Sequence, residues 1–95
     1  DRHIMVGTPN IDGIREIFKI HTERMHLDKK ISLNKIFKAM DGFSGAEIKA
    51  SCTEAGYFAI RENRTFIIEK DFVLAVKKVK EKEEQEGSDY MTMFG

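Results

Sequence analysis

Few residues in the chain have side chains that could bind a metal or act as a nucleophile or base, and their spacing matches no catalytic centre. The histidines stand at positions 3, 21 and 26, a spacing that does not match a zinc site. The sequence shows no glycine-rich phosphate loop and no nucleophile paired with a base. We therefore expect this chain by itself to have no catalytic residues, to hold no metal ion and to hydrolyse nothing.

His21 is the histidine that most needs an explanation. It falls on the apolar stripe of a predicted helix that also carries Ile17 and Met25. Histidines are commonly half-buried at such boundaries. The spacing alone therefore favours a structural histidine over one that binds a ligand.

The single cysteine, Cys52, shares the inner stripe of another predicted helix with Ile48, Ala55 and Ala59. A reactive thiol needs an exposed and electropositive setting, which these neighbours do not provide. We expect Cys52 to be a packing residue. One cysteine also excludes a disulfide within the chain and fits a reducing compartment.

The apolar periodicity predicts four helices that share one core, in an all-α fold. Asn10, Ser32 and Ser44 are expected to cap the first three, and Glu47 completes a capping box with Ser44. The predicted segments are a helix over 11–24, a short helix from Ser32 to Met40, a helix over 44–63, an extended link over 65–68, and a charge-dense helix from Glu69 that Gly87, Ser88 and Asp89 break.

The charge balance excludes some partners. Lys and Arg number 16, as do Asp and Glu, so the net charge is zero. This balance argues against a nucleic-acid arm or a patch that binds an anionic membrane. No apolar run reaches the roughly 20 residues that a membrane span needs. On composition and pattern alone, the chain is a generic protein-interaction domain.

Six stretches of the chain carry a resemblance to a known family: Asp1-Arg2, Arg15 to Thr22, Gly42 to Ile48, Cys52 to Gly56, Phe58 to Arg61 and Lys70 to Phe72. They resemble the C-terminal lid of AAA ATPases, and specifically their proteasomal branch, which includes archaeal proteasome-activating nucleotidases and eukaryotic proteasome regulatory ATPases. Cys-Thr-Glu-Ala-Gly and Ala-Ile-Arg together are specific to that branch, whereas Ser-Gly-Ala is shared more widely.

The resemblance implies a role in a larger enzyme that uses ATP and Mg²⁺, with Mg²⁺ bound outside this chain. Such lids close over the adenine end of the nucleotide and pack on the next subunit of a hexameric ring of identical or paralogous ATPases. Hydrolysis then changes the angle between the lid and the large domain, and this motion unfolds protein substrates for the 20S proteasome core. Assembly chaperones are further partners that the resemblance implies.

The resemblance also implies which residues contact the nucleotide. His21 matches the histidine of the family's Ile-His-Thr sequence, which contacts the adenosine, and Gly45 and Ala46 match the segment that lies against the adenine. Small side chains at a helix start let its backbone approach a flat base closely. The alternative is an ordinary capped helix start, which is compatible with this role.

The C-terminal residues Met93, Phe94 and Gly95 resemble the family's docking tail, which ends in a hydrophobic residue, a tyrosine and any residue. Phe94 replaces the tyrosine, so a hydroxyl hydrogen bond worth roughly 0.5–1.5 kcal/mol is missing. The family's Thr or Ser cap before the fourth helix is also replaced, by Ile68.

These expectations divide the chain into the end of an upstream large domain with its connecting turn over 1–9, the helical lid over 10–80, and a charged helix end with a flexible docking tail over 81–95. They place the protein in the cytoplasm, and also in the nucleus if it is eukaryotic. The alternatives are a non-catalytic domain that docks an assembly chaperone, the lid of another AAA unfoldase, and a histone-like DNA binder, against which the zero net charge counts.

Overall fold

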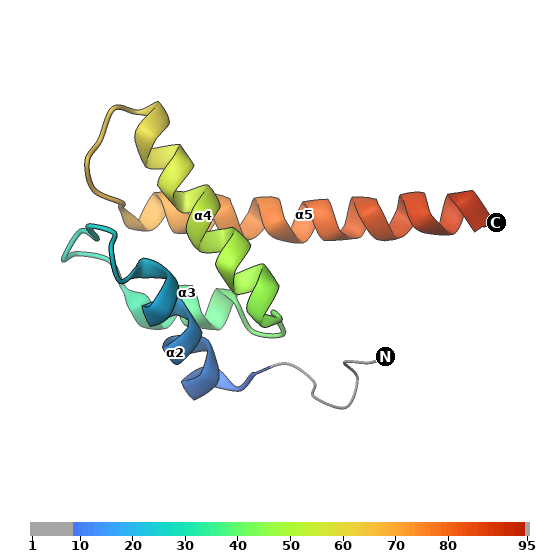
Figure 1. The fold of residues 1–95 in the computed structure, drawn as a ribbon, viewed down its shortest axis with the longest axis horizontal. Coiled ribbons are helices and arrows are strands. Elements are labelled where there is room, and N and C mark those ends of the chain that lie inside the picture. The colour runs from blue at the N-terminus through green and yellow to red at the C-terminus, as the bar shows by residue number, and fades with distance from the viewer. Residues whose placement is uncertain (1–8, 95) are drawn as a thin grey trace.

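The described part of the chain is built from helices joined by short connections. The structure, a computed structural model, describes the backbone of residues 9–94 and the side chains of residues 9–82. Its helices are α2 (Ile11–Thr22), α3 (Leu33–Ala39), α4 (Gly45–Arg61) and α5 (Glu69–Phe94) (Figure 1). The all-α fold with four helices is therefore confirmed for this part of the chain.

Two of the three expected caps form as the sequence predicts. The side chain of Asn10 accepts a hydrogen bond of 2.9 Å from the N–H of Gly13. Ser44 and Glu47 form the full capping box, in which each side chain accepts from the other residue's backbone N–H. These bonds satisfy N–H groups that a helix start otherwise leaves without a partner.

The third cap differs from the prediction. Ser32 does occupy the position before α3, but its side chain makes no capping hydrogen bond. Instead its backbone N–H donates to the carboxylate of Glu69 at 2.7 Å. Because Glu69 is the first residue of α5, this bond ties the start of α3 to the start of α5 across 37 positions of the sequence.

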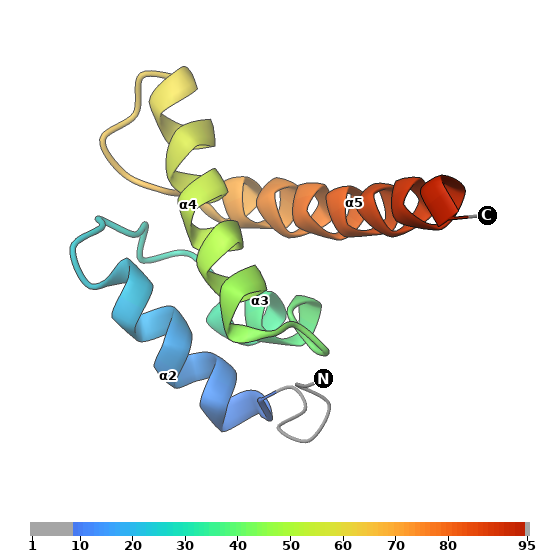
Figure 2. The ribbon, with the colours of Figure 1, turned by 45° about the vertical axis from the view of Figure 1, so that its right-hand side comes forward.

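The core lies where α4 crosses between α2 and α5, and α3 closes it from below (Figures 1 and 2). The ring of Phe18 lies 5.2 Å from the rings of both Phe37 and Phe72, so three helices meet at one aromatic contact. Such pairs add roughly 0.5–1.5 kcal/mol each beyond the area they bury. Cys52 is fully buried in this core, as expected.

The connection that follows α2 and the connection that precedes α5 are hydrogen-bonded to each other. Leu27, after α2, forms an isolated parallel bridge with Ile67, just before α5. The N–H of Asp28 donates to the carbonyl of Ile67, and the N–H of Ile67 donates to the carbonyl of His26, both at 2.8 Å. The extended link before α5 is thereby confirmed, and it holds two segments 40 positions apart side by side.

The predicted break near the C-terminus is wrong. α5 continues through Gly87, Ser88 and Asp89 to Phe94. A glycine inside a helix costs about 1 kcal/mol relative to alanine, and Ser or Asp costs less, so three such residues weaken a helix without forbidding it. Lys, Glu and Gln, which form helices well, stand immediately before them.

Within the described residues, no helix has the length and apolar character that crossing a membrane requires.

Candidate functional site

The start of α4 presents small residues and free backbone donors. The capping box uses the N–H groups of Ser44 and Glu47. Those of Gly45 and Ala46 lie in the first turn, where a helix has no acceptor of its own to offer. Ala46 is exposed and Gly45 is half-buried. The surface at this helix end is therefore flat, with no long side chain at positions 45 and 46.

The packing inside the chain does not explain the glycine at position 45. A methyl group there would lie 3.8 Å from Cδ1 of Ile17, an ordinary van der Waals contact. Gly45 also has no positive φ, unlike Gly42, whose φ is 87°. Gly13 differs, because a methyl group there would lie 2.8 Å from the side chain of Pro9. Neither the backbone conformation at position 45 nor the packing of the described residues requires a glycine there.

His21 lies on the α2 ridge that runs beside α4. α2 and α4 begin at the same end of the molecule and run side by side (Figures 1 and 2). Ile17 is the nearest side chain to Gly45, and Met25 is the nearest to Gly56, further along α4. His21 lies one helical turn after Ile17 and is half-buried, whereas Met25 lies in the connection that follows the end of α2 at Thr22.

Two of the predicted site residues therefore lie at the start of α4, and the third lies on α2, which packs beside α4. Gly45 and Ala46 are consecutive at the α4 start, and His21 is one turn from the residue that packs against Gly45. We call these three residues, which the resemblance predicts to contact the adenosine, the adenine surface. Of the predicted docking tail, Met93 and Phe94 belong to the last turn of α5, and the side chains of residues 93–95 lie outside the described residues.

Cys52 takes no part in this site. It has no exposed surface, and burial raises the pKa of its thiol to about 12. The thiolate is therefore negligible near neutral pH, which confirms the packing role predicted for it. Among residues 9–82, no group of three or more His, Cys, Asp or Glu side chains could hold a metal ion.

The sequence reasoning missed an ion pair that holds α5 in place. The guanidinium of Arg64 binds both carboxylate oxygens of Asp71, with Nη2 to Oδ1 at 2.9 Å, and it also pairs with Glu62. Asp71 in turn accepts a hydrogen bond of 2.9 Å from the N–H of Ile68. This bond caps α5 where the family's Thr or Ser is missing.

The environment of Asp71 favours its ionised form. Burial by itself would raise the pKa of this carboxyl, because only 2% of the residue is exposed. The hydrogen bonds from Arg64 and from the Ile68 N–H outweigh burial and hold the pKa of Asp71 below its ordinary value. The carboxylates of Asp71 and Glu62 in turn raise the pKa of the Arg64 guanidinium.

Comparison with known proteins places a segment of this chain in a family. Residues 30–74, which run from the end of the α2–α3 connection into α5, match the AAA+ lid domain. This segment of the chain belongs to the AAA+ lid family. The match covers the start of α4 with Gly45 and Ala46, whereas His21 lies before it.

Similarity to individual relatives extends over nearly the whole chain. The chain is 48% identical to a proteasome-activating nucleotidase of Methanopyrus kandleri over 99% of its residues, and 48% identical to that of Methanococcus vannielii over all of them. It is 48% identical to the 26S proteasome regulatory subunit 8 homolog B of Arabidopsis thaliana over 87% of its residues. The resemblance of the lid to those of proteasomal AAA ATPases is thereby confirmed.

The lid corresponds to only part of these relatives. It covers 22%, 24% and 20% of their respective lengths.

Proposed function

We propose that this lid belongs to a proteasome-activating ATPase and closes over the adenine end of its ATP. The observation that carries the proposal is Gly45, whose lack of a side chain is required neither by the backbone nor by the packing of the lid. Gly45 leaves the first position of α4 without a side chain, and this fits a surface that something flat approaches closely. The similarity to proteasome-activating nucleotidases supports adenine as the group that approaches this surface.

The residues present fit an adenine. Gly45 and Ala46 offer a flat helix start, and their N–H groups can donate to ring nitrogens. His21, on the neighbouring α2 ridge, can donate or accept a hydrogen bond from the adenosine side. ATP with Mg²⁺ supplies the energy of hydrolysis in the whole enzyme, and this chain contributes only contacts to the base.

The partners follow from the same proposal. The lid packs on the large domain of the next subunit in a hexameric ring, and the ring passes unfolded substrates to the proteasome core. A lid that contacts the nucleotide and a neighbouring subunit couples the two, because its angle differs between nucleotide states.

Replacing His21 by alanine tests the site assignment. In the full-length protein, His21→Ala should weaken ATP binding about fivefold, which corresponds to losing a contact worth roughly 1 kcal/mol. The lid should keep its melting temperature. His26→Ala is the matched control, because His26 is exposed on the connection after α2 and should leave ATP affinity unchanged. A variant that melts earlier but binds ATP normally would make His21 a structural residue.

The C-terminus is expected to dock on the core particle. Deleting Phe94 and Gly95 should reduce stimulation of core-particle peptidase activity by the full-length ring and leave its ATP hydrolysis unchanged. Restoring the hydroxyl with Phe94→Tyr should strengthen stimulation, because the missing hydrogen bond is regained. Several tails on one ring act together, so the effect of each tail is small by itself. Equal stimulation by truncated and intact rings would show that docking uses another element.

A further inference from the structure

The chain contains the dipeptide Asp-Gly twice, as Asp12 with Gly13 and as Asp41 with Gly42. In this dipeptide the backbone nitrogen of the glycine can attack the side-chain carboxyl carbon of the aspartate, because glycine has no side chain that shields the nitrogen. The aspartate must first rotate its peptide bond so that this nitrogen faces the carboxyl group. The reactivity of each site therefore depends on how firmly the fold holds that peptide.

The peptide between Asp12 and Gly13 is firmly held in the first turn of α2. The N–H of Gly13 donates to the side chain of Asn10 at 2.9 Å. A methyl group on Gly13 would lie 2.8 Å from the side chain of Pro9, so little space is left around this peptide. The carboxylate of Asp12 also pairs with Arg15 at 3.4 Å. Rotation at Asp12 therefore breaks the cap of α2.

The peptide between Asp41 and Gly42 is held by no such bond. The N–H of Phe43 donates to the carbonyl of Met40 at 2.9 Å, so Asp41 and Gly42 are the central residues of a β-turn between α3 and α4. Among the described residues, the N–H of Gly42 has no acceptor. Gly42 has a φ of 87°, and a methyl group there would meet no atom within 4 Å. This peptide can therefore rotate without losing a hydrogen bond from its N–H.

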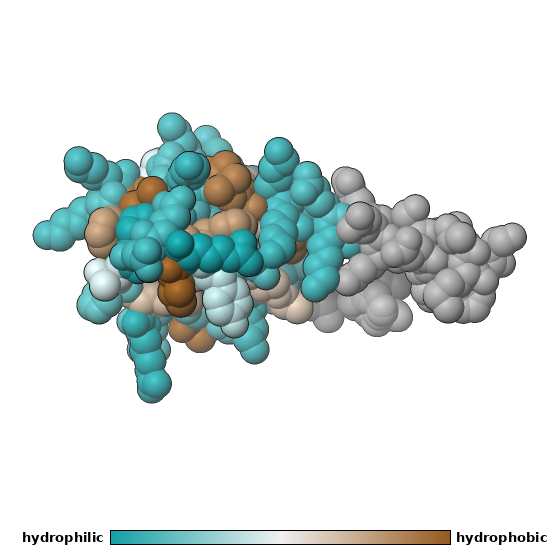
Figure 3. All heavy atoms as spheres, turned by 90° about the horizontal axis from the view of Figure 1, so that it is seen from above, coloured by the Kyte–Doolittle hydropathy of each residue, from teal (hydrophilic) through white to brown (hydrophobic). Residues whose placement is uncertain are grey.

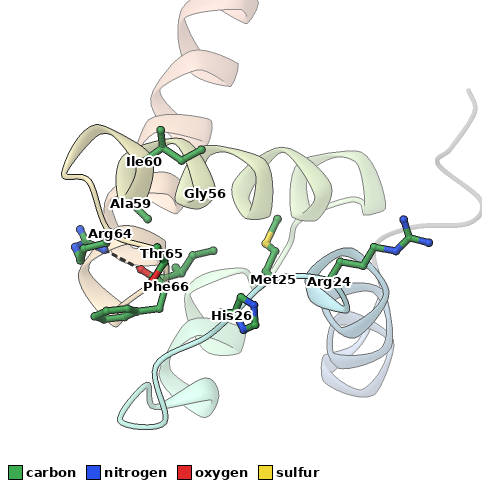
Figure 4. Close-up of a pocket in the computed structure, with 10 residues that line it drawn as sticks. Arg24, Met25, His26, Gly56, Ala59, Ile60, Arg64, Thr65 and Phe66 are labelled. Carbon is green, nitrogen blue, oxygen red and sulfur yellow. Dashed lines mark hydrogen bonds between the residues drawn. The ribbon is translucent and has the colours of Figure 1, made fainter.

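The other two connections are held more firmly. In the α4–α5 connection the guanidinium of Arg64 donates to the carbonyl of Phe66 at 3.3 Å (Figure 4). The α2–α3 connection contains an aspartate, Asp28, whose carbonyl accepts from the N–H of Ile31 at 3.2 Å. The residue after Asp28 is Lys29, whose side chain shields the backbone nitrogen. Asp41 is therefore the aspartate of these connections that is best placed to react.

Access to water does not distinguish the two Asp-Gly sites. Asp12 and Asp41 are both exposed. Hydrophilic side chains predominate on the face of the described residues that Figure 3 shows, so water wets this surface widely. A difference in reactivity between the two sites therefore comes from the restraint on the peptide.

We propose that Asp41 is a site of spontaneous isomerisation to isoaspartate. The nitrogen of Gly42 attacks Cγ of Asp41, and the hydroxyl of the carboxyl group leaves with the amide proton as water, which closes a succinimide ring. Water then adds to the ring. Cleavage of the bond between the nitrogen and Cγ restores aspartate, whereas cleavage of the bond between the nitrogen and the main-chain carbonyl carbon gives isoaspartate. One water is released and one is consumed, so no oxidant or cofactor is needed.

The product changes the link that leads into the start of α4. In isoaspartate the main chain runs through Cβ and Cγ instead of the main-chain carbonyl carbon, so the link is longer by one bond. The ring of Phe43, which follows, is buried in the core, and Ser44 caps α4. The extra length must therefore be accommodated between a buried ring and a helix cap. The proposal does not rest on nucleotide binding, because its chemistry involves only this chain and water.

Peptide mapping of the full-length protein tests the proposal. The protein is incubated at neutral pH in water enriched in heavy oxygen, which ring hydrolysis incorporates, and is then digested with trypsin. Electron-transfer fragmentation distinguishes isoaspartate from aspartate. Isoaspartate should form about fivefold or more faster at Asp41 than at Asp12, because rotation at Asp12 must first break the helix cap. Equal rates at the two sites, or no conversion at Asp41, would overturn the proposal.

Unfolding separates the effect of the fold from that of the neighbouring residues. In guanidinium chloride neither peptide is held, so the two sites should convert at rates within about twofold of each other. If Asp41 keeps the same advantage over Asp12 in the unfolded protein, the β-turn is not its cause and the structural argument is overturned.

Two variants test the restraint itself. Asn10→Ala removes the acceptor of the Gly13 N–H and should speed conversion at Asp12 about fivefold without changing the rate at Asp41. Asp41→Glu is the matched control, because glutamate keeps the charge but closes the larger ring far more slowly, so heavy oxygen should no longer enter at position 41. An unchanged rate at Asp12 in Asn10→Ala, or undiminished incorporation in Asp41→Glu, would overturn the proposal.

Discussion

Replacing Asp71 by alanine should lower the free energy of unfolding of the lid by about 2 kcal/mol. The change removes the hydrogen bond that caps α5 at Ile68 and leaves the guanidinium of Arg64 without its bidentate partner. A helix cap contributes about 1 kcal/mol, and a buried pair that loses one member costs more than an exposed one. Urea unfolding followed by circular dichroism measures the difference.

Glu62→Ala is the control for this prediction. Glu62 pairs with the same arginine, but its side chain is 55% exposed, so its loss should cost less than about 0.5 kcal/mol. If the two substitutions destabilise the lid equally, the α5 cap is unimportant.

The Asp71 contribution should also depend on pH. Because the folded-state pKa of this carboxyl lies below its ordinary value of 3.8, the stabilisation is fully present above that pH. It is lost as the pH falls further, through the folded-state pKa. The difference in stability between the wild-type chain and Asp71→Ala should therefore be constant near neutral pH and shrink in strong acid.

The Asp71 pair shows what the sequence could not reveal. Asn10 and Ser44 were predictable as caps because their partners lie three positions away and the pattern is local. Arg64 and Asp71 are seven positions apart, and Asn63, directly before Arg64, takes a left-handed conformation with a φ of 58°. Asparagine is one of the few residues that adopts this conformation readily, but the sequence does not say where it will.

The same distinction applies to the helices and to the sites. The α3 cap was wrong because the partner of Ser32 is Glu69, which local reasoning does not consider. The break in α5 was wrong because propensity gives a weak penalty rather than a stop. For the adenine surface, the resemblance supplied the three residues, whereas the structure adds that the packing leaves Gly45 unexplained.

The other large effect is expected at Ala46. In the full-length protein, Ala46→Leu should weaken ATP binding about tenfold or more, because overpacking a close contact costs roughly 1–3 kcal/mol. The isolated lid should unfold at nearly the same urea concentration, since the position is exposed and leucine forms helices almost as well as alanine.

Ala50→Leu is the matched control for Ala46→Leu. Ala50 is also exposed on α4, four residues further along, and it lines a hollow beside α5 rather than the helix start. ATP affinity should be unchanged in this variant. If Ala46→Leu also leaves affinity unchanged, the start of α4 does not face the base.

Photolabelling of the full-length protein with 8-azido-ATP tests the central claim most directly, because the reactive group sits on the adenine ring itself. After irradiation and digestion, mass spectrometry should find label on peptides that contain His21 or Gly45 and Ala46, and excess ATP should prevent it. Peptides from the far end of α4, such as those with Ile60, should stay unlabelled. If ATP-protected label appears only outside the lid, then the lid does not close over the adenine, and the account of these residues is contradicted.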